Sequence, residues 1–142
     1  MTSDFLGNGT IGDTSGSVLI SQIALNSPTG ITVTTEVGGL TTSSCPRANG
    51  AALSAGLKPN GMAIDYAGCG GAGCLYWIDV QDWPAIRMLD RSTGLVSTIT
   101  GSATGCPAGA YVDGPAASAC FVQPVSLAFV PATGKAWFSL TL

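Results

Sequence analysis

Histidine is absent from this 142-residue chain, and charged residues make up only 9% of it. Without histidine, the Ser-His-Asp and Cys-His arrangements of nucleophilic catalysis cannot form, and zinc loses one of its two main ligand types. Five Lys and Arg against eight Asp and Glu leave a net charge of −3. So few basic residues cannot neutralise many phosphates, which disfavours nucleic-acid binding. We therefore expect no catalytic site, no cofactor, no bound metal and no nucleic-acid partner.

Long apolar runs are missing as well, because none approaches the roughly 18 residues that a membrane helix needs. The segment 1–4 has no basic residues and no apolar run follows it, so the N-terminus does not resemble a signal peptide. What is present is an apolar fraction of 46%, which is enough for a core and argues against disorder. The chain is therefore expected to be globular, without a membrane span.

Low charge together with many Gly, Ser and Thr residues is typical of an extracellular surface. We expect an extracellular or cell-surface location, with this chain as one portion of a longer or processed secreted polypeptide. The alternative is that Met1 is the genuine start, in which case the protein is cytosolic and its thiols are reduced. Asn8-Gly9-Thr10 is the only N-glycosylation sequon, so Asn8 is the candidate glycan site of a glycoprotein.

Four of the five cysteines bracket turn-rich segments. Cys69 and Cys74 flank a Gly-rich stretch, and Cys106 and Cys120 flank a loop rich in Gly and Pro. Local disulfides within each pair are the natural interpretation. Cys45 is then left over and is a candidate for a crosslink between chains. The alternatives are five buried thiols or, more weakly, zinc, which here lacks both a CxxC pair and histidine.

Glycine and proline, 20 and 8 residues, interrupt nearly every window of helical length. Short runs of β-branched and aromatic residues separated by turn residues dominate instead, which indicates an all-β fold. Four strands joined by tight turns are expected over 61–66, 75–79, 85–90 and 95–100. Such an antiparallel meander is the unit of a β-propeller blade.

Strand-like runs also open at Pro28, Pro59 and Pro124, so the chain contains an uneven repeat. Between Pro59 and Pro124 lie the motifs Leu-Tyr-Trp-Ile-Asp, Ile-Arg-Met-Leu-Asp, Thr-Gly, Val-Ser-Thr and Asp-Gly-Pro-Ala. In these motifs the sequence resembles the NHL-repeat β-propeller family. It departs from the family pattern after the second strand, where Asp82-Trp83-Pro84 replaces an Asn-His motif.

The resemblance implies one all-β domain made of blades of unequal length. Its expected parts are a strand plus linker over 1–27, a short blade over 28–58, a full blade over 59–123 and a partial blade over 124–142. A closed propeller needs at least four blades of about 40 residues, so this one is expected to be incomplete or open. Open strand edges invite strand addition from another chain.

Other patterns that suggest chemistry have simpler explanations. Two Gly-x-Gly-x-x-Gly stretches, 7–12 and 68–73, match the dinucleotide fingerprint, but neither opens a helix. Asp65 and Asp79 end adjacent expected strands and could share one rim, either as an acid/base or cation pair or as acceptors for turn amides. Trp77, Trp83 and Trp137 could form a carbohydrate platform. Trp77 and Trp137 are instead expected in the core, which leaves Trp83 as the candidate contact residue.

The sequence thus favours a non-enzymatic extracellular scaffold that binds other protein chains. In its specific form, the protein is a subunit of a filamentous or cell-surface assembly completed by strand exchange. The N-terminal strand would supply the anchors Phe5 and Leu6. The alternative is a fragment of a larger secreted propeller that acts as a ligand-binding module or as a lyase- or hydrolase-like enzyme.

Overall fold

The computed structural model describes residues 4–7, 20–24, 32–39, 47–80, 83–101, 106 and 111–140. Their regular structure consists of β-strands and two short 3-10 turns, η1 (Ala52–Ser54) and η2 (Cys69–Gly71). The expected all-β fold is confirmed. Among these residues there is no helix of the length and apolarity needed to cross a membrane. The chain divides into two compact units, Met1–Leu57 and Lys58–Leu142.

The first unit contains a three-stranded antiparallel sheet in the order β1-β2-β3. These strands are β1 (Asp4–Gly7), β2 (Ile20–Ala24) and β3 (Thr32–Val37), and the short β4 (Gly50–Ala51) follows them. Ile20 of β2 and Val37 of β3 lie opposite each other and are both buried. The strand β2 was not predicted from the sequence, which suggested a linker in that segment.

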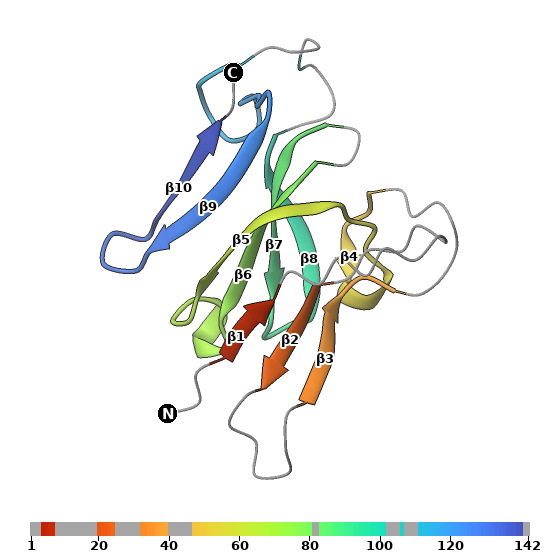
Figure 1. Cartoon of the computed structure of the whole chain (residues 1–142). Coiled ribbons are helices and arrows are strands. Elements are labelled where there is room, and N and C mark those ends of the chain that lie inside the picture. The colour runs from red at the N-terminus through yellow and green to blue at the C-terminus, as the bar shows by residue number, and fades with distance from the viewer. Residues whose placement is uncertain are drawn as a thin grey trace. The chain divides into compact units, whose positions relative to one another are not determined.

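The second unit contains the predicted meander. Its strands are β5 (Pro59–Asp65), β6 (Cys74–Asp79), β7 (Ala85–Asp90) and β8 (Leu95–Thr100). Each pairs with the next in antiparallel fashion, and Figure 1 shows them side by side in chain order. The turn between β7 and β8 needs a left-handed residue, which Gly94 provides at φ 69°. A second hairpin, β9 (Pro124–Val130) and β10 (Lys135–Leu140), completes the unit.

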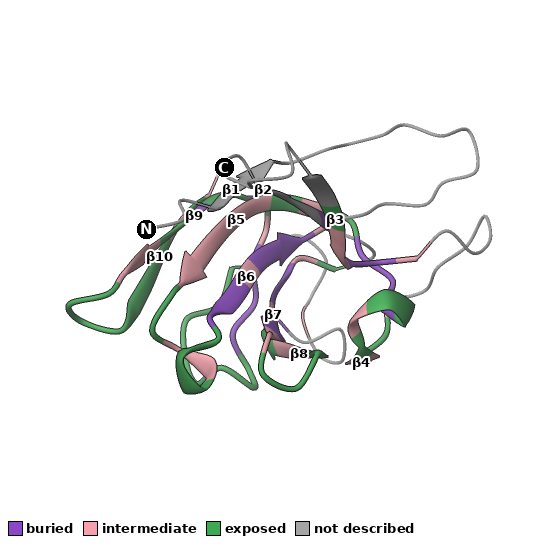
Figure 2. Cartoon of the chain, turned by 90° about the horizontal axis from the view of Figure 1, so that it is seen from below, coloured by how far each residue is buried: buried purple, intermediate pink, exposed green. Residues whose placement is uncertain are grey.

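The two faces of the meander bury different side chains because successive residues of a strand point to opposite sides. One side, called here the Trp77 face, carries Leu75, Trp77 and Asp79 of β6. The opposite side, the Ile78 face, carries Ile78 of β6 and Ile86 of β7. Figure 2 shows β6 as largely buried.

The Ile78 face packs on the β9–β10 hairpin. Ile78 and Ile86 form a core cluster with Phe121 and Leu127, and Phe138 packs against it. The rings of Phe121 and Phe138 meet edge to face, with centroids 4.8 Å apart. The hairpin is therefore held by an apolar core in which aromatic rings interdigitate.

Gly61 sets the distance between β5 and β9. A Cβ atom at this position would lie 2.9 Å from the Cα of Ser126 and 2.9 Å from the carbonyl oxygen of Val125. Both atoms belong to the backbone of β9, so the crowding cannot be relieved by a side-chain rotation. Only glycine allows the two strands to approach this closely.

Replacing Gly61 by valine is expected to lower the free energy of unfolding by about 1–3 kcal/mol, because the branched side chain forces β9 away from β5. Urea denaturation followed by circular dichroism measures the change. Gly134→Ala is the comparison variant, since a Cβ there has open space and the only cost is its φ of 63°. A Gly61→Val protein as stable as wild type would show that β9 does not pack against β5 in this way.

Candidate functional site

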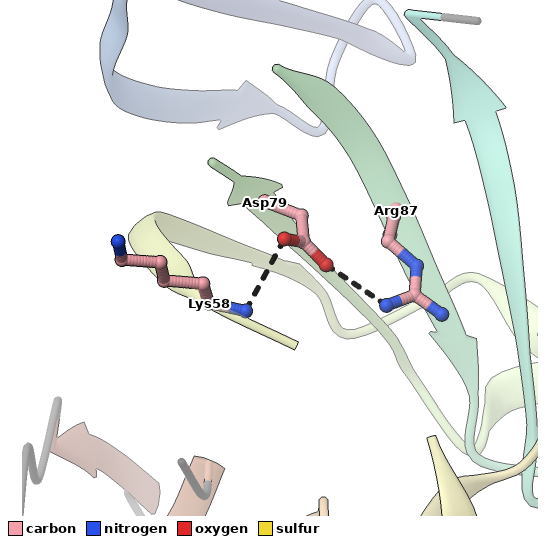
Figure 3. A network of polar contacts seen from close by, with 3 residues as sticks. All are labelled: Lys58, Asp79 and Arg87. Atoms are coloured by element: carbon pink, nitrogen blue, oxygen red, sulfur yellow. Dashed lines mark hydrogen bonds and ion pairs between the residues drawn. The ribbon is translucent and has the colours of Figure 1, made fainter. Parts of the chain in front are cut away.

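A buried ion pair joins β6 to β7 in the second unit. Asp79 is the last residue of β6, Arg87 lies in the middle of β7, and both side chains are 0% exposed. Arg87 Nη1 lies 2.9 Å from Asp79 Oδ2, and the backbone amide of Lys58 donates to Asp79 Oδ1 at 3.2 Å. Figure 3 shows Asp79 between these two donors.

Trp77 completes this buried network. It lies directly opposite Arg87 in the sheet, and the guanidinium carbon is 5.4 Å from the centroid of its ring. A cation over an indole face is attracted by the ring quadrupole, most strongly where water is excluded. The carboxylate and the ring together compensate the buried charge of the guanidinium.

The network also sets the position of Val80, the residue that follows β6. Asp79 accepts from the amide of Lys58, and the amide of Val80 in turn donates to the carbonyl of Lys58 at 2.9 Å. These two hydrogen bonds close the end of β6 onto the residue that precedes β5. The buried carboxylate of Asp79 therefore positions Lys58, and Lys58 in turn positions the backbone of Val80.

Val80 also lines a cavity of about 440 Å³. It is formed where β5 begins, β6 ends, β7 begins and the linker enters β9. Its described lining residues are Asn60, Val80, Pro84, Val122, Gln123, Pro124 and Val125. The side-chain amide of Asn60 donates to the carbonyl of Pro124 at 3.3 Å, which ties the start of β5 to the start of β9.

Five of the seven described lining residues are proline or valine. Pro124 is the first residue of β9 and Pro84 immediately precedes β7, which are the positions where a missing backbone N–H costs a sheet least. The polar side chains of the described lining are two carboxamides, Asn60 and Gln123, each able to donate and to accept hydrogen bonds, and backbone atoms of the wall add further polar surface. Such a wall suits a neutral ligand with hydroxyl, amide or carbonyl groups.

The described lining of the cavity contains no nucleophile, acid or base. No group of three His, Cys, Asp or Glu residues that could hold a metal ion occurs in the part of the chain that the structure describes. The arrangement can therefore bind and orient a small molecule through its amides, but these residues supply no proton transfer.

Both cysteine pairs form disulfides in the structure, Cys69 with Cys74 and Cys106 with Cys120. Cys69 and Cys74 bracket η2 and the beginning of β6. Cys106 and Cys120 close the linker that leads to the cavity. Cys120 also exchanges two backbone hydrogen bonds with Val112, at 3.0 and 3.1 Å. The second disulfide thus anchors the segment that delivers Val122 and Gln123 to the site.

The other candidate residues are placed as follows. Trp83 is 38% exposed and precedes Pro84 of the cavity wall. Phe5 and Leu6 lie in β1, which pairs with β2 of the same chain. Asn8 and Cys45 lie outside the described residues. Glycosylation, the crosslink and strand exchange between copies all stay predictions.

The expectation that Asp65 and Asp79 share one rim is wrong. The strands β5 and β6 are antiparallel, so Asp65 pairs with Cys74 at one end of the sheet while Asp79 pairs with Pro59 at the other. Asp65 accepts from the amide of Ala67 at 3.0 Å, as expected for an aspartate at a turn.

Asp90 has the same role as Asp65 at the end of β7. It accepts from the hydroxyl of Ser92 at 2.6 Å and from the amide of Ser92 at 2.8 Å. These hydrogen bonds, led by the one from the hydroxyl, lower the pKa of Asp90 because they stabilise the ionised carboxylate. Asp65 and Asp90 thus stabilise the turns that follow their strands by accepting hydrogen bonds from turn residues.

The expectation of a core position holds for Trp77 but is wrong for Trp137. Trp77 is 0% exposed, whereas Trp137 is 65% exposed. Trp77 pairs with Met62, and in the second hairpin it is Phe138 that pairs at the corresponding place, with Leu127. Trp137 comes one residue earlier than Phe138, and an offset of one residue turns a side chain to the other face of a strand.

Sequence reasoning missed Asn60, Gln123 and Arg87. A signal existed for Arg87, because a lone arginine in an apolar strand needs a buried anion and the facing strand ends in an aspartate. For Asn60 and Gln123 no local signal exists, because the segments that form the cavity are distant in sequence. Asn60 and Pro124, which are in contact there, are 64 residues apart.

Comparison with known proteins gives structural matches alone. No family model matches the chain, and no curated protein is significantly similar in sequence. The resemblance to the NHL-repeat family therefore stays a prediction. The fold is shared with large proteins of Bacteroides.

One is an auxiliary nutrient binding protein from Bacteroides ovatus, with a TM-score of 0.66 and 26% identity over 84% of this chain. A second such protein, from Bacteroides thetaiotaomicron, has a TM-score of 0.65 and 19% identity over 84% of this chain. A protein of unknown function from the same organism has a TM-score of 0.67 and 23% identity over 87% of this chain. The chain covers 27% to 29% of the length of these proteins.

Proposed function

We propose that this chain is a ligand-binding module of an extracytoplasmic protein and that its cavity takes a small, neutral ligand. The observation that carries the proposal is the cavity itself, where Asn60 and Gln123 stand among valine and proline and the described lining is uncharged. Small-molecule sites are typically apolar concavities with a few placed polar groups. The similarity to an auxiliary nutrient binding protein of Bacteroides ovatus supports the same role.

The two disulfides support the extracytoplasmic location, since such bonds persist in oxidising compartments. The module is proposed to act without catalysis. Its described cavity wall lacks the acids, bases and nucleophiles that a lyase or hydrolase needs. Asp79 and Arg87 pair with each other, and Asp79 also accepts from the amide of Lys58, so we propose that they help to hold Val80 of the cavity wall in place.

Replacing Gln123 by alanine is expected to weaken binding of the neutral ligand about tenfold, because one hydrogen bond is lost and a polar group of the ligand is left unpaired. A thermal-shift screen with monosaccharides, disaccharides, neutral amino acids, citrate and inorganic phosphate identifies the ligand class. Isothermal titration calorimetry then compares wild type with Gln123→Ala.

Leu95→Ala is the matched control, because Leu95 is exposed at the opposite end of β8 from the cavity. Hits confined to neutral compounds, with affinity lost in Gln123→Ala and kept in Leu95→Ala, support the proposal. Binding of citrate or phosphate alone, or equal affinity in Gln123→Ala and wild type, contradicts it.

A further inference from the structure

Asparagine followed directly by glycine occurs three times in the chain, at Asn8, Asn49 and Asn60. Such a pair is chemically labile, because glycine has no side chain to keep its backbone nitrogen away from the preceding carboxamide. Asn8 lies outside the described residues. The other two pairs differ in what surrounds their glycines, so the structure distinguishes their reactivity.

The reaction at such a pair is deamidation. The backbone nitrogen of the glycine attacks the side-chain carbonyl carbon of the asparagine, a C–N bond forms, and the side-chain nitrogen leaves as ammonia. One water then adds to either carbonyl of the resulting succinimide and opens the ring. The product is an aspartate or an isoaspartate, in which the chain runs through the side chain. No oxidant, reductant or enzyme takes part, so the controlling step is whether the backbone can bend into the ring.

At Asn49 this bending meets little resistance. Asn49 is exposed, and Gly50 begins β4, which is only two residues long. A strand this short opens locally at little cost in free energy. Gly50 has a φ of 122°, and a Cβ atom built on it would meet nothing within 4 Å among the described residues. The backbone of Gly50 therefore has room to turn toward the carboxamide of Asn49.

Asn60 is also exposed, but the segment around it is held more firmly. Its carboxamide donates to the carbonyl of Pro124 at 3.3 Å, so the nitrogen that must leave is engaged in a hydrogen bond. Gly61 lies within the seven-residue strand β5, where backbone atoms of Val125 and Ser126 come within 2.9 Å of a Cβ position. Closing the ring at Asn60 requires β5 to move away from β9.

We propose that Asn49 is a site of spontaneous deamidation in the folded protein and that β9 protects Asn60 from the same reaction. Deamidation at Asn49 adds a negative charge to an exposed segment of the first unit. At Asn60 it would place a carboxylate in a cavity wall whose described side chains are uncharged, and would remove the donor to Pro124. The packing that shapes the cavity thus also preserves its carboxamide, whichever ligand the cavity binds.

The test compares the two sites in native and in unfolded protein. Wild type is incubated at mildly alkaline pH, in buffer and in concentrated urea, and chymotryptic peptides are analysed by mass spectrometry after reduction and alkylation. Cleavage after Leu57 places Asn49 and Asn60 on different peptides. In buffer, Asn49 is expected to deamidate about tenfold faster than Asn60, which corresponds to about 1.4 kcal/mol in activation free energy. In urea the two rates are expected to be similar, because β9 no longer covers Gly61.

Asn49→Gln is the matched control, because the longer glutamine side chain has to close a larger and less favourable ring. This variant should keep the circular dichroism spectrum of wild type and lose the modification at position 49. Leu127→Ala weakens the core that holds β9, so its rate at Asn60 in buffer should rise about tenfold while its rate at Asn49 stays unchanged. The comparison of wild type in buffer and in urea stands even if Leu127→Ala fails to fold.

Three results would overturn the proposal. The first is that Asn60 deamidates in buffer as fast as Asn49. The second is that Asn49 stays unmodified in buffer, since the fold would then protect it too. The third is that the rate at Asn60 is the same in buffer and in urea, because packing against β9 would then have no protective role.

Discussion

Replacing Arg87 by methionine while keeping Asp79 is expected to lower the free energy of unfolding by about 3–5 kcal/mol. The methionine fills most of the space of the arginine stem, but the carboxylate of Asp79 remains, fully buried and without its guanidinium partner. A buried carboxylate without a cation is strongly unfavourable, because its hydration is lost and the hydrogen bond from the amide of Lys58 compensates only part of that loss. Guanidinium denaturation followed by circular dichroism measures this change.

The double variant Asp79→Asn with Arg87→Met separates loss of packing from loss of charge compensation. The introduced carboxamide would keep an oxygen that can accept from the amide of Lys58, and no buried charge remains. We therefore expect this double variant to recover most of the stability lost in Arg87→Met. If Arg87→Met and the double variant are equally unstable, the cost lies in packing against Trp77, and the ion pair does not have the role described here.

Opening the Cys106–Cys120 disulfide, by the paired replacement Cys106→Ala with Cys120→Ala, is expected to cost about 3 kcal/mol of stability. The bond spans a sequence separation of 14, and in the chain-entropy model a longer closed loop restrains the unfolded chain more strongly. The corresponding variant at Cys69 and Cys74, with a separation of 5, is expected to lose only about 2 kcal/mol.

The two disulfide variants also differ in their expected effect on the cavity. Cys120 holds the linker just before Val122 and Gln123, so the first variant should lose ligand affinity as well as stability. The variant at Cys69 and Cys74 alters the opposite end of β6 and should lose stability alone. Denaturation curves with and without reducing agent give the stabilities. Non-reducing peptide maps that recovered all four cysteines as free thiols would contradict both disulfides and favour a cytosolic protein.

The meander of the second unit could be predicted because its strands are specified locally. Alternation of apolar and polar residues marks the strand from Leu95 to Thr100, and the turn before it ends in Gly94, which adopts the left-handed conformation that glycine favours. The same local reasoning failed over 20–24, where surrounding Gly, Ser and Thr residues suggested a linker and the structure has β2. That strand owes its place to β1 and β3, which pair with it on either side.

The site could be predicted only in part, because its geometry depends on pairing between strands. Asp79 was recognised as a strand-end aspartate, but its partner Arg87 follows from the register of β6 against β7. The burial of Trp77 and the exposure of Trp137 differ for the same reason. Both lie in apolar second strands of a hairpin, and only the pairing partners decide which face each of them occupies.

By itself, the sequence determined the all-β class, the four strands of the meander and the natural pairing of four cysteines, because turn residues and alternation act over a few neighbouring positions. Only the tertiary structure decided where the cavity lies, which two charges pair between β6 and β7, and which tryptophan is buried. Asn60 in β5 and Pro124 at the start of β9 are in contact although they are 64 residues apart in sequence. They meet because Gly61 lets two backbones approach and because Ile78, Phe121 and Leu127 share one core.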